Sequence, residues 1–444
     1  MKLSLSTALL IPACLLSQVL ASPTVGIRTI SRRSDEPLAP LQDPWYNAPD
    51  GFEKTAPGTV LRIREAPGNL TSLVTNASAA YNILYRTTNS RYKPDWAVTT
   101  VFVPTTKTPA LLSYQIPYDS VFLDASPSYV LYSDDSTNYH TDISTGLASG
   151  WFVNVPDYEG PLASFTAGVQ SGHATIDSVR AIQALNGTLG LATGARTALW
   201  GYSGGALASE WALELQVQYA PELNFTGAAL GGLTTNITSV LLSINGGIAA
   251  GLAPSAILGQ SSQHPEEYEY IISRLKTTGT HNATGFLATL NLTADEADVA
   301  FAFQDIGDYF IGGISDLTGS LAGAETDRDG IMGYHGVPQA PLFVYKAIAD
   351  EISVVADTDE LVERYCAVGA NILYQRNTVG GHSAEYVNGH PAALTWLSSV
   401  LGGTYAQDYN TTGCITENVT VNITSTALRR RDVGGSAWTL HKGY

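Results

Sequence analysis

The sequence predicts an α/β fold in which a mostly parallel central sheet has helices on both faces and carries a mainly helical insertion. Over most of the chain, short runs rich in β-branched and aromatic residues alternate with stretches of helical periodicity, which is typical of a parallel sheet. From residue 231 to 340 this alternation stops, and helical stretches and glycines replace it. With 444 residues, 44% hydrophobic and 14% charged, the chain can bury one large core plus an insertion.

The expected strands differ in how deeply they should be buried. The first two, at residues 59–64 and 81–87, have the pattern of antiparallel strands at the sheet edge, and those at 96–103 and 110–116 are apolar enough to be buried. The other strands are expected at residues 150–155, 197–201, 226–230, 341–346 and 371–376.

Helices are expected between these strands. Apolar residues at Ile176, Val179, Ile182 and Leu185 have helical spacing, which predicts a helix over residues 171–185 with one solvated face. The other helices of the core are expected at residues 205–219, 358–369 and 391–401. The core thus comprises residues 34–230 and 341–414, followed by a loosely packed tail, residues 415–444.

The insertion, residues 231–340, lies between two strands that should be neighbours in the sheet. Its helical stretches are expected at residues 239–252, 265–275, 293–303 and 309–321. Folds of this kind bind ligands at the carboxyl ends of the strands. We therefore interpret the insertion as a cap over that edge of the sheet.

Residues 201–205 read Gly-Tyr-Ser-Gly-Gly and match a Gly-x-Ser-x-Gly pattern, which also arises by chance. The context is more specific, because an expected strand runs into the motif and an expected helix leaves it. A serine in such a turn has its hydroxyl exposed at the sheet edge, and the flanking glycines keep side chains out of the crossing chain. Ser203 is therefore a candidate nucleophile; an ordinary glycine-rich turn is the alternative.

A nucleophilic serine needs a histidine base and an acid that orients the base, and with this motif they follow in the order acid, then histidine. Position in the chain argues against His140, His173, His264, His281, His335, His390 and His441. His382 remains, in a glycine-rich loop after the strand at 371–376. Asp350 follows the strand at 341–346, with Glu351 as its competitor and Asp357 as a more distant one. Consecutive strands would bring both partners to the edge that carries Ser203.

Four segments together resemble the fungal secretory lipase family, the lipase A type of α/β-hydrolase. They are residues 201–206, 219–224, 349–352 and 369–372, within a resemblance that extends from about residue 49 to 414. Their combination is much more specific than the serine motif alone. The resemblance implies an α/β-hydrolase fold, and it places the family's catalytic triad on Ser203, Asp350 and His382.

The resemblance also implies an oxyanion hole and a disulfide. The oxyanion hole would use Gly204 and Asp119, the latter through its backbone N–H or a protonated side chain, because a carboxylate would repel the oxyanion; a loop-capping aspartate is the alternative. The family's disulfide corresponds to Cys366 and Cys414. Its second disulfide has no counterpart, because Ala125 stands where a cysteine is expected.

The amino-terminal residues have the pattern of an exported protein. Residues 1–21 show a basic start, an apolar stretch and a small final residue, as in a secretory signal peptide, and a dibasic pair at 32–33 would end a candidate propeptide, residues 22–33. We expect a secreted protein without a transmembrane anchor. Candidate glycosylation sites are Asn69, Asn76, Asn186, Asn224, Asn236, Asn282, Asn291, Asn410, Asn418 and Asn422.

The net charge argues against some classes of binding partner. A formal net charge of −17 argues against nucleic acid and against anionic lipid headgroups. The mechanism implied by the triad requires no metal and no cofactor. Residues 325–330 resemble a calcium loop but lack its final glutamate, because Gly336 stands there, so we expect a solvated turn.

The expected chemistry is hydrolysis of a carboxylic ester through an acyl-enzyme. On family resemblance the favoured function is a lipase that hydrolyses acylglycerols, with transient contact to a lipid–water interface. The alternative is an esterase or deacetylase for acetylated small molecules such as fungal secondary metabolites of the trichothecene type. A serine peptidase and a non-catalytic binding protein are less favoured.

Overall fold

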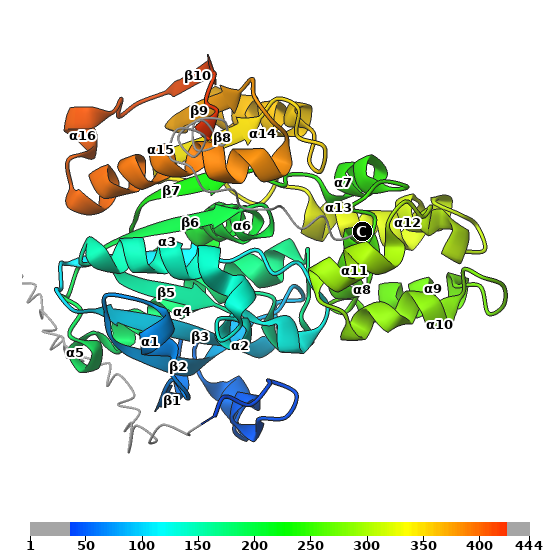
Figure 1. Ribbon diagram of the computed structural model, residues 1–444, viewed down its shortest axis with the longest axis horizontal. Coiled ribbons are helices and arrows are strands. Elements are labelled where there is room, and N and C mark those ends of the chain that lie inside the picture. Colours follow the sequence, from blue (N-terminus) through cyan, green and yellow to red (C-terminus); the bar gives the residue numbers. More distant parts are fainter. Residues whose placement is uncertain (1–35, 424–444) are drawn as a thin grey trace, which may run out of the picture.

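The computed structural model describes residues 36–423, which form a ten-stranded sheet flanked by helices (Figure 1). The expected signal peptide, the candidate propeptide and residues 424–444 lie outside the described residues. The strands are β1 (Val60–Glu65), β2 (Ala77–Thr88), β3 (Pro94–Pro104), β4 (Ala110–Gln115), β5 (Phe152–Pro156), β6 (Arg196–Tyr202), β7 (Phe225–Gly231), β8 (Leu342–Ala347), β9 (Ile372–Asn377) and β10 (Cys414–Val419). Their order in the sheet is β1-β2-β3-β5-β4-β6-β7-β8-β9-β10.

The sheet is antiparallel at one end and parallel elsewhere. β1 pairs antiparallel with β2, β2 with β3, and β3 with β5. All the other neighbouring strands in the sheet, from β5 and β4 across to β9 and β10, pair in parallel. The carboxyl ends of β6, β8 and β9 therefore meet at the same edge. The predicted α/β class with a mostly parallel sheet is confirmed.

Helices cover both faces of the sheet because side chains alternate along each strand. In β6, Leu199 belongs to the core under α4, α6 and α14, whereas Trp200 belongs to the opposite core under α1, α3 and α15. The helices around the sheet are α1 (Leu70–Leu73), α2 (Pro127–Val130), α3 (Thr137–Ala148), α4 (Gly168–Ala184), α5 (Asn186–Leu189), α6 (Gly204–Tyr219), α14 (Val355–Ala367), α15 (His382–Gly402) and α16 (Tyr405–Asp408). Short 3₁₀ helices are η1 (Pro44–Tyr46), η2 (Phe52–Lys54), η3 (Leu123–Ala125), η4 (Asp134–Ser136), η5 (Gly160–Leu162), η6 (Ala288–Asn291) and η7 (Ile306–Tyr309).

The insert, residues 232–341, connects β7 to β8 and forms a separate helical group beside the sheet (Figure 1). Its helices are α7 (Ile237–Ile244), α8 (Leu252–Ser261), α9 (Pro265–Arg274), α10 (Ala283–Leu287), α11 (Ala294–Phe301), α12 (Ser315–Thr318) and α13 (Ser320–Gly330). They enclose a third apolar core that includes Ile271, Phe286 and Phe310. Within residues 36–423, no helix is long and apolar enough to cross a membrane.

Three expectations about the insert are wrong. The helix expected at 309–321 is a turn followed by the short α12, and α13 begins as a separate helix after Gly319. The helix expected at 239–252 ends at Ile244, because Gly246, with a positive φ of 74°, turns the chain, and the next helix, α8, begins only at Leu252. Residues 325–330 are not a solvated turn but the end of α13, where buried Asp329 accepts from the backbone N–H of Val169 and pairs with His264. Among the described residues, no three His, Cys, Asp or Glu side chains are arranged to hold a metal ion.

The expected solvated face of α4 is also wrong. Nearly every residue from the start of α4 to Ile182 is buried, because α6, β2 and α13 all pack against it. Gly168 lies so close to α6 that a Cβ there would be 2.1 Å from the ring of Trp211. Helical spacing shows which residues face the sheet, but it cannot show that other helices cover the remaining sides.

The helix expected to begin at Pro391 begins nine residues earlier, at His382. Pro391 lies inside α15, where it leaves one carbonyl of the preceding turn without its usual partner. Proline is common at the first position of a helix, so the sequence favours a start at Pro391, whereas the helix starts directly after Gly381. His382 is therefore the first residue of a long helix and not part of a loop.

The first part of the tail expected from residue 415 belongs to the sheet. β10 pairs in parallel with the whole of β9. The expected boundary after residue 414 is therefore too early. As an edge strand β10 is mostly exposed, so it lacks the buried apolar residues that would reveal it in the sequence.

A disulfide joins Cys366, at the end of α14, to Cys414, the first residue of β10. It closes a loop with a sequence separation of 48. Closing such a loop restricts the unfolded chain, so replacing both cysteines with serine should lower the free energy of unfolding by about 2–4 kcal/mol. Urea unfolding followed by circular dichroism measures this; an unchanged midpoint would show that the bond contributes nothing.

Candidate active site

Ser203 lies in the sharp turn between β6 and α6. Its φ of 52° is positive, which is unusual for a residue with a side chain and typical of a strained nucleophile elbow. The flanking glycines permit the turn: a Cβ at Gly201 would lie 2.1 Å from the carbonyl oxygen of Gly205, and one at Gly205 would lie 1.9 Å from that of Gln115. The turn thus presents the hydroxyl beyond the end of β6.

The structure brings together the three residues that the sequence analysis selected. His382 Nε2 lies 2.9 Å from Ser203 Oγ, and His382 Nδ1 lies 2.8 Å from Asp350 Oδ2. Both bonds have the length needed for proton transfer from the hydroxyl and for orientation of the imidazole. Asp350 follows β8 and His382 follows β9, so neighbouring parallel strands supply the two partners.

Asp350 is buried, yet its surroundings favour the carboxylate. Its Oδ1 accepts hydrogen bonds from the backbone N–H groups of Ile352 and Ser353 at 3.0 and 2.9 Å. Burial alone would raise the pKa of Asp350, but the hydrogen bond from His382 and the charge of Lys346 outweigh it and lower the pKa to about 2. Asp350 is therefore ionised at neutral pH.

Lys346 is a positioning residue that the sequence analysis did not identify. Its fully buried side chain donates from Nζ to Asp350 Oδ2 at 3.0 Å and to the carbonyl of Leu233 at 3.0 Å. Burial lowers the pKa of Lys346, and the carboxylate of Asp350 opposes that shift. The sequence does carry a signal for this role. A lysine stands near the end of an otherwise apolar strand, four residues before the acid.

Replacing Lys346 with methionine should destabilise the protein by about 3–5 kcal/mol, because a buried carboxylate loses its partner. The low pKa of Asp350, about 2 against an ordinary 3.8, gives stability that is present above about pH 4 and lost as the pH falls toward 2. The variant raises the pKa of Asp350, so its acid unfolding should begin at higher pH.

Thermal unfolding from pH 2 to 7 tests this prediction. Lys93→Met, at an exposed position, is the matched control. An acid limb of Lys346→Met that coincides with that of the control would contradict the prediction.

The alternative acid, Glu351, contacts the histidine at a different place. Its Oε2 accepts from the backbone N–H of His382 at 2.8 Å, whereas the imidazole bonds to Asp350. The hydroxyl of Tyr202 donates to the backbone carbonyl of His382 at 2.6 Å. Glu351 and Tyr202 thus hold the first residue of α15 in place. Asp357 lies in the first turn of α14.

Gly204 and Asp119 lie next to each other beside the serine. A Cβ at Gly204 would be 2.0 Å from Asp119 Oδ1, so only glycine fits. Asp119 has a positive φ of 46°, and its Oδ1 is buried without a hydrogen-bond partner among the described residues. Burial, followed by the charge of Asp298, raises the pKa of Asp119 to about 7. A neutral carboxyl group can therefore form near the point where an oxyanion would develop.

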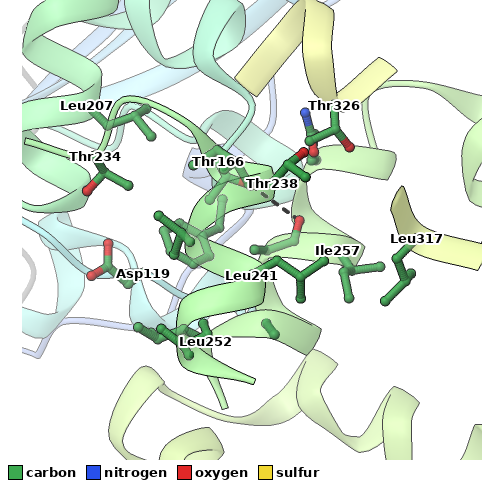
Figure 2. Close-up of a pocket in the computed structure, with 18 of the residues that line it drawn as sticks. Asp119, Thr166, Leu207, Thr234, Thr238, Leu241, Leu252, Ile257, Leu317 and Thr326 are labelled. Atoms are coloured by element: carbon green, nitrogen blue, oxygen red, sulfur yellow. Dashed lines mark hydrogen bonds between the residues drawn. The ribbon is translucent and has the colours of Figure 1, made fainter. Parts of the chain in front are cut away.

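A cavity opens at Ser203 and extends into the insert. Figure 2 shows part of its lining. Asp119, Gly204 and Leu207 border it beside the serine, and aliphatic side chains of the insert form most of its remaining lining. The aliphatic side chains contributed by the insert are those of Ile237, Val240, Leu241, Ile244, Leu252, Ala253, Ala256, Ile257, Ile271, Leu317 and Ala322. The site combines a serine, a histidine and a buried acid with a mainly apolar binding cavity.

The ten candidate glycosylation asparagines are all at least partly exposed. Asn236 and Asn282 also use their side-chain oxygens to cap α7 and α10. Four of the side-chain nitrogens that would carry glycans donate hydrogen bonds, those of Asn76, Asn186, Asn282 and Asn410. Glycosylation itself stays a prediction.

Comparison with known proteins relates this site to ester hydrolases. The secretory lipase family matches residues 136–408. The chain is 52% identical to trichothecene C-3 esterase of Fusarium sporotrichioides over 424 residues, 92% of this chain and 94% of that protein. It is 37% identical to lipase A of Arthroderma benhamiae over 404 residues, 87% of this chain and 84% of that protein. The closed state of Candida antarctica lipase A is a similar solved structure, with a TM-score of 0.75, 29% identity, and coverage of 84% of this chain and 88% of that one.

Proposed function

The chain belongs to the secretory lipase family and is a carboxylic-ester hydrolase, and we propose that it removes short acyl groups from small acylated molecules of the trichothecene type. Ser203, His382 and Asp350 would carry out the reaction. The observation that carries the proposal is the cavity that begins at Ser203, because its mainly apolar lining with a few polar groups suits a small acylated molecule with an apolar skeleton.

The mechanism assigns a step to each side chain. His382 accepts the proton of Ser203 as the hydroxyl oxygen attacks the ester carbonyl, and Asp350 stabilises the imidazolium. The backbone N–H of Gly204 and Asp119, through its N–H or its neutral carboxyl, stabilise the oxyanion; one such donor is worth ~3 kcal/mol. His382 then protonates the departing alcohol, which leaves an acyl-serine. Water attacks this ester with His382 as base, and the acid is released.

Two relatives favour different substrates. The esterase from Fusarium sporotrichioides shares more of this sequence than lipase A from Arthroderma benhamiae, 52% against 37% identity. That difference supports a small acylated molecule over an acylglycerol, which reverses the order favoured by the sequence alone. The same triad also permits amide hydrolysis, but neither relative is named a peptidase.

A lipase is the second candidate, and exposed apolar side chains on the insert favour it. Leu242, Ile248, Val299 and Phe303 are 56%, 69%, 84% and 72% exposed. Such side chains are suited to contact with a lipid–water interface. The aliphatic lining of the cavity would also accept a long acyl chain.

We also propose that the protein is secreted and glycosylated. The signal-like residues 1–21, the exposed sequons and the disulfide between Cys366 and Cys414 support this. Its partner is then an ester substrate met outside the cell.

Hydrolysis of a graded set of esters tests the substrate class. The set comprises p-nitrophenyl esters from acetyl to palmitoyl, emulsified triacylglycerol and acetylated trichothecenes, each with Ser203→Ala as background. We expect kcat/KM to be highest for the acetylated trichothecene and to fall as the acyl chain lengthens. A maximum at palmitoyl together with rapid triacylglycerol hydrolysis would favour the lipase instead.

A further inference from the structure

Part of the cavity lining is polar, and it is built by three helices of the insert. Gln260 on α8, Glu267 on α9 and Thr326 on α13 form this polar wall. α8, α9 and α13 contact one another, so their side chains converge. Figure 2 shows Thr326 and Asp119 on opposite sides of the cavity, with Thr238 and Leu241 between them. The polar wall therefore lies away from the oxyanion side of the cavity.

Two atoms of the polar wall are buried without a partner. Gln260 and Glu267 are each 3% exposed, and neither Gln260 Nε2 nor Glu267 Oε2 has a hydrogen bond among the described residues. Burying a polar group without a hydrogen-bond partner is unfavourable. A ligand that supplied partners for both atoms would remove that cost.

The neighbours of Glu267 make it a hydrogen-bond donor near neutral pH. Burial, followed by the charges of Glu325 and Asp329, raises the pKa of Glu267 to about 8. The carboxylates of Glu325 and Asp329 lie 3.3 and 3.0 Å from the ring nitrogens of His264. The imidazole therefore pairs with these two carboxylates and not with Glu267. A protonated Glu267 carries an O–H that no described residue accepts.

Gln260 and Thr326 add a hydrogen-bond donor and an acceptor to the polar wall. The side-chain amide of Gln260 can donate hydrogen bonds through its N–H groups. A Cβ at Gly330 would lie 3.2 Å from the amide nitrogen, so glycine at position 330 leaves room for the amide. The hydroxyl of Thr326 donates to the carbonyl of Ala322 at 2.9 Å. Its oxygen therefore keeps lone pairs that can accept a hydrogen bond.

We propose that the polar wall binds an oxygen function, a hydroxyl or an ether oxygen, on the alcohol part of the substrate ester. This inference rests on the proposed function, in which the acyl group is short and the alcohol fills the cavity. An ether oxygen would accept from Gln260 and Glu267, and a hydroxyl could in addition donate to Thr326. A plain hydrocarbon would leave all three groups unpaired.

The test compares alcohols that differ in one oxygen. Matched pairs of tricyclic terpenoid alcohols, with and without a second hydroxyl remote from the first, are measured as competitive inhibitors of p-nitrophenyl butyrate hydrolysis, and their acetates as substrates. The wild type should bind the oxygenated member roughly tenfold more tightly, and its acetate should show a similar gain in kcat/KM. Active sites counted with a fluorophosphonate normalise every rate, so partial misfolding does not mimic the effect.

Variants separate recognition from general damage. Gln260→Leu and Glu267→Leu should each reduce the preference to near one, whereas Glu267→Gln, which keeps a neutral donor, should retain it. Glu266→Leu, at the exposed neighbouring position on α9, is the matched control and should also retain it. A wild type without preference, or a preference unchanged in both leucine variants, would overturn the inference.

The two assays also distinguish this inference from the proposed function. If the acetates are not hydrolysed but the inhibitors still show a preference that Gln260→Leu abolishes, the proposed substrate class is wrong and the polar wall still binds oxygen. If the acetates are hydrolysed without any preference, the proposed function stands and the inference fails.

Discussion

Replacing Ser203 with alanine should lower kcat for ester hydrolysis by about a millionfold, the loss expected when a triad loses its nucleophile. In the structure the hydroxyl of Ser203 is the one that bonds to His382 Nε2, at 2.9 Å. Without it no acyl-enzyme forms, and the residual rate comes only from the oxyanion hole and from binding. Steady-state rates on p-nitrophenyl butyrate measure the effect.

Controls for this prediction must exclude contamination and loss of the fold. Ser72→Ala, at an exposed position in α1, should keep the wild-type rate. Circular dichroism should show that Ser203→Ala unfolds at a temperature close to that of the wild type, because alanine keeps the same backbone conformation and only the hydroxyl is removed. A residual activity above one percent would mean that another residue is the nucleophile.

Asp350→Asn should lower kcat by about ten-thousandfold. The amide would present N–H groups to both His382 Nδ1 and Lys346 Nζ, which lie 2.8 and 3.0 Å from Asp350 Oδ2. The imidazole would then be held in the wrong tautomer, with its proton on the nitrogen that faces Ser203. The negative charge that stabilises the imidazolium would also be lost.

Glu351→Gln is the matched control for Asp350→Asn. Its side-chain oxygen can still accept from the backbone N–H of His382, as Glu351 Oε2 does at 2.8 Å, so a far smaller loss is expected. Rates of both variants between pH 6 and 9 make the comparison. A larger loss in Glu351→Gln than in Asp350→Asn would show that the acid is wrongly assigned.

Much of this site could be predicted because its parts follow local rules. The serine motif has a strand before it and a helix after it, and parallel strands bring the residues that follow β8 and β9 to the same edge. Chain order and strand ends were therefore enough to select Asp350 and His382. Lys346 was missed because its role depends on a contact with the acid that only the folded chain reveals.

The errors have a common physical cause, which is that local patterns do not report tertiary neighbours. The periodicity of α4 does not show that α6 and α13 cover its remaining sides. Pro391 indicates a helix start when considered alone, yet α15 continues through it. The polar wall joins residues from α8, α9 and α13, and no spacing along the chain connects them.

The most direct test of the account is to trap the acyl-enzyme and locate it. The protein is mixed with a p-nitrophenyl ester, quenched in acid within the first turnovers, and digested for peptide mass spectrometry. We predict an added acyl mass on Ser203 that is absent from Ser203→Ala and strongly reduced in His382→Ala. Rapid hydrolysis with the acyl group on another residue, or with no acyl-serine under any quench condition, would contradict the account.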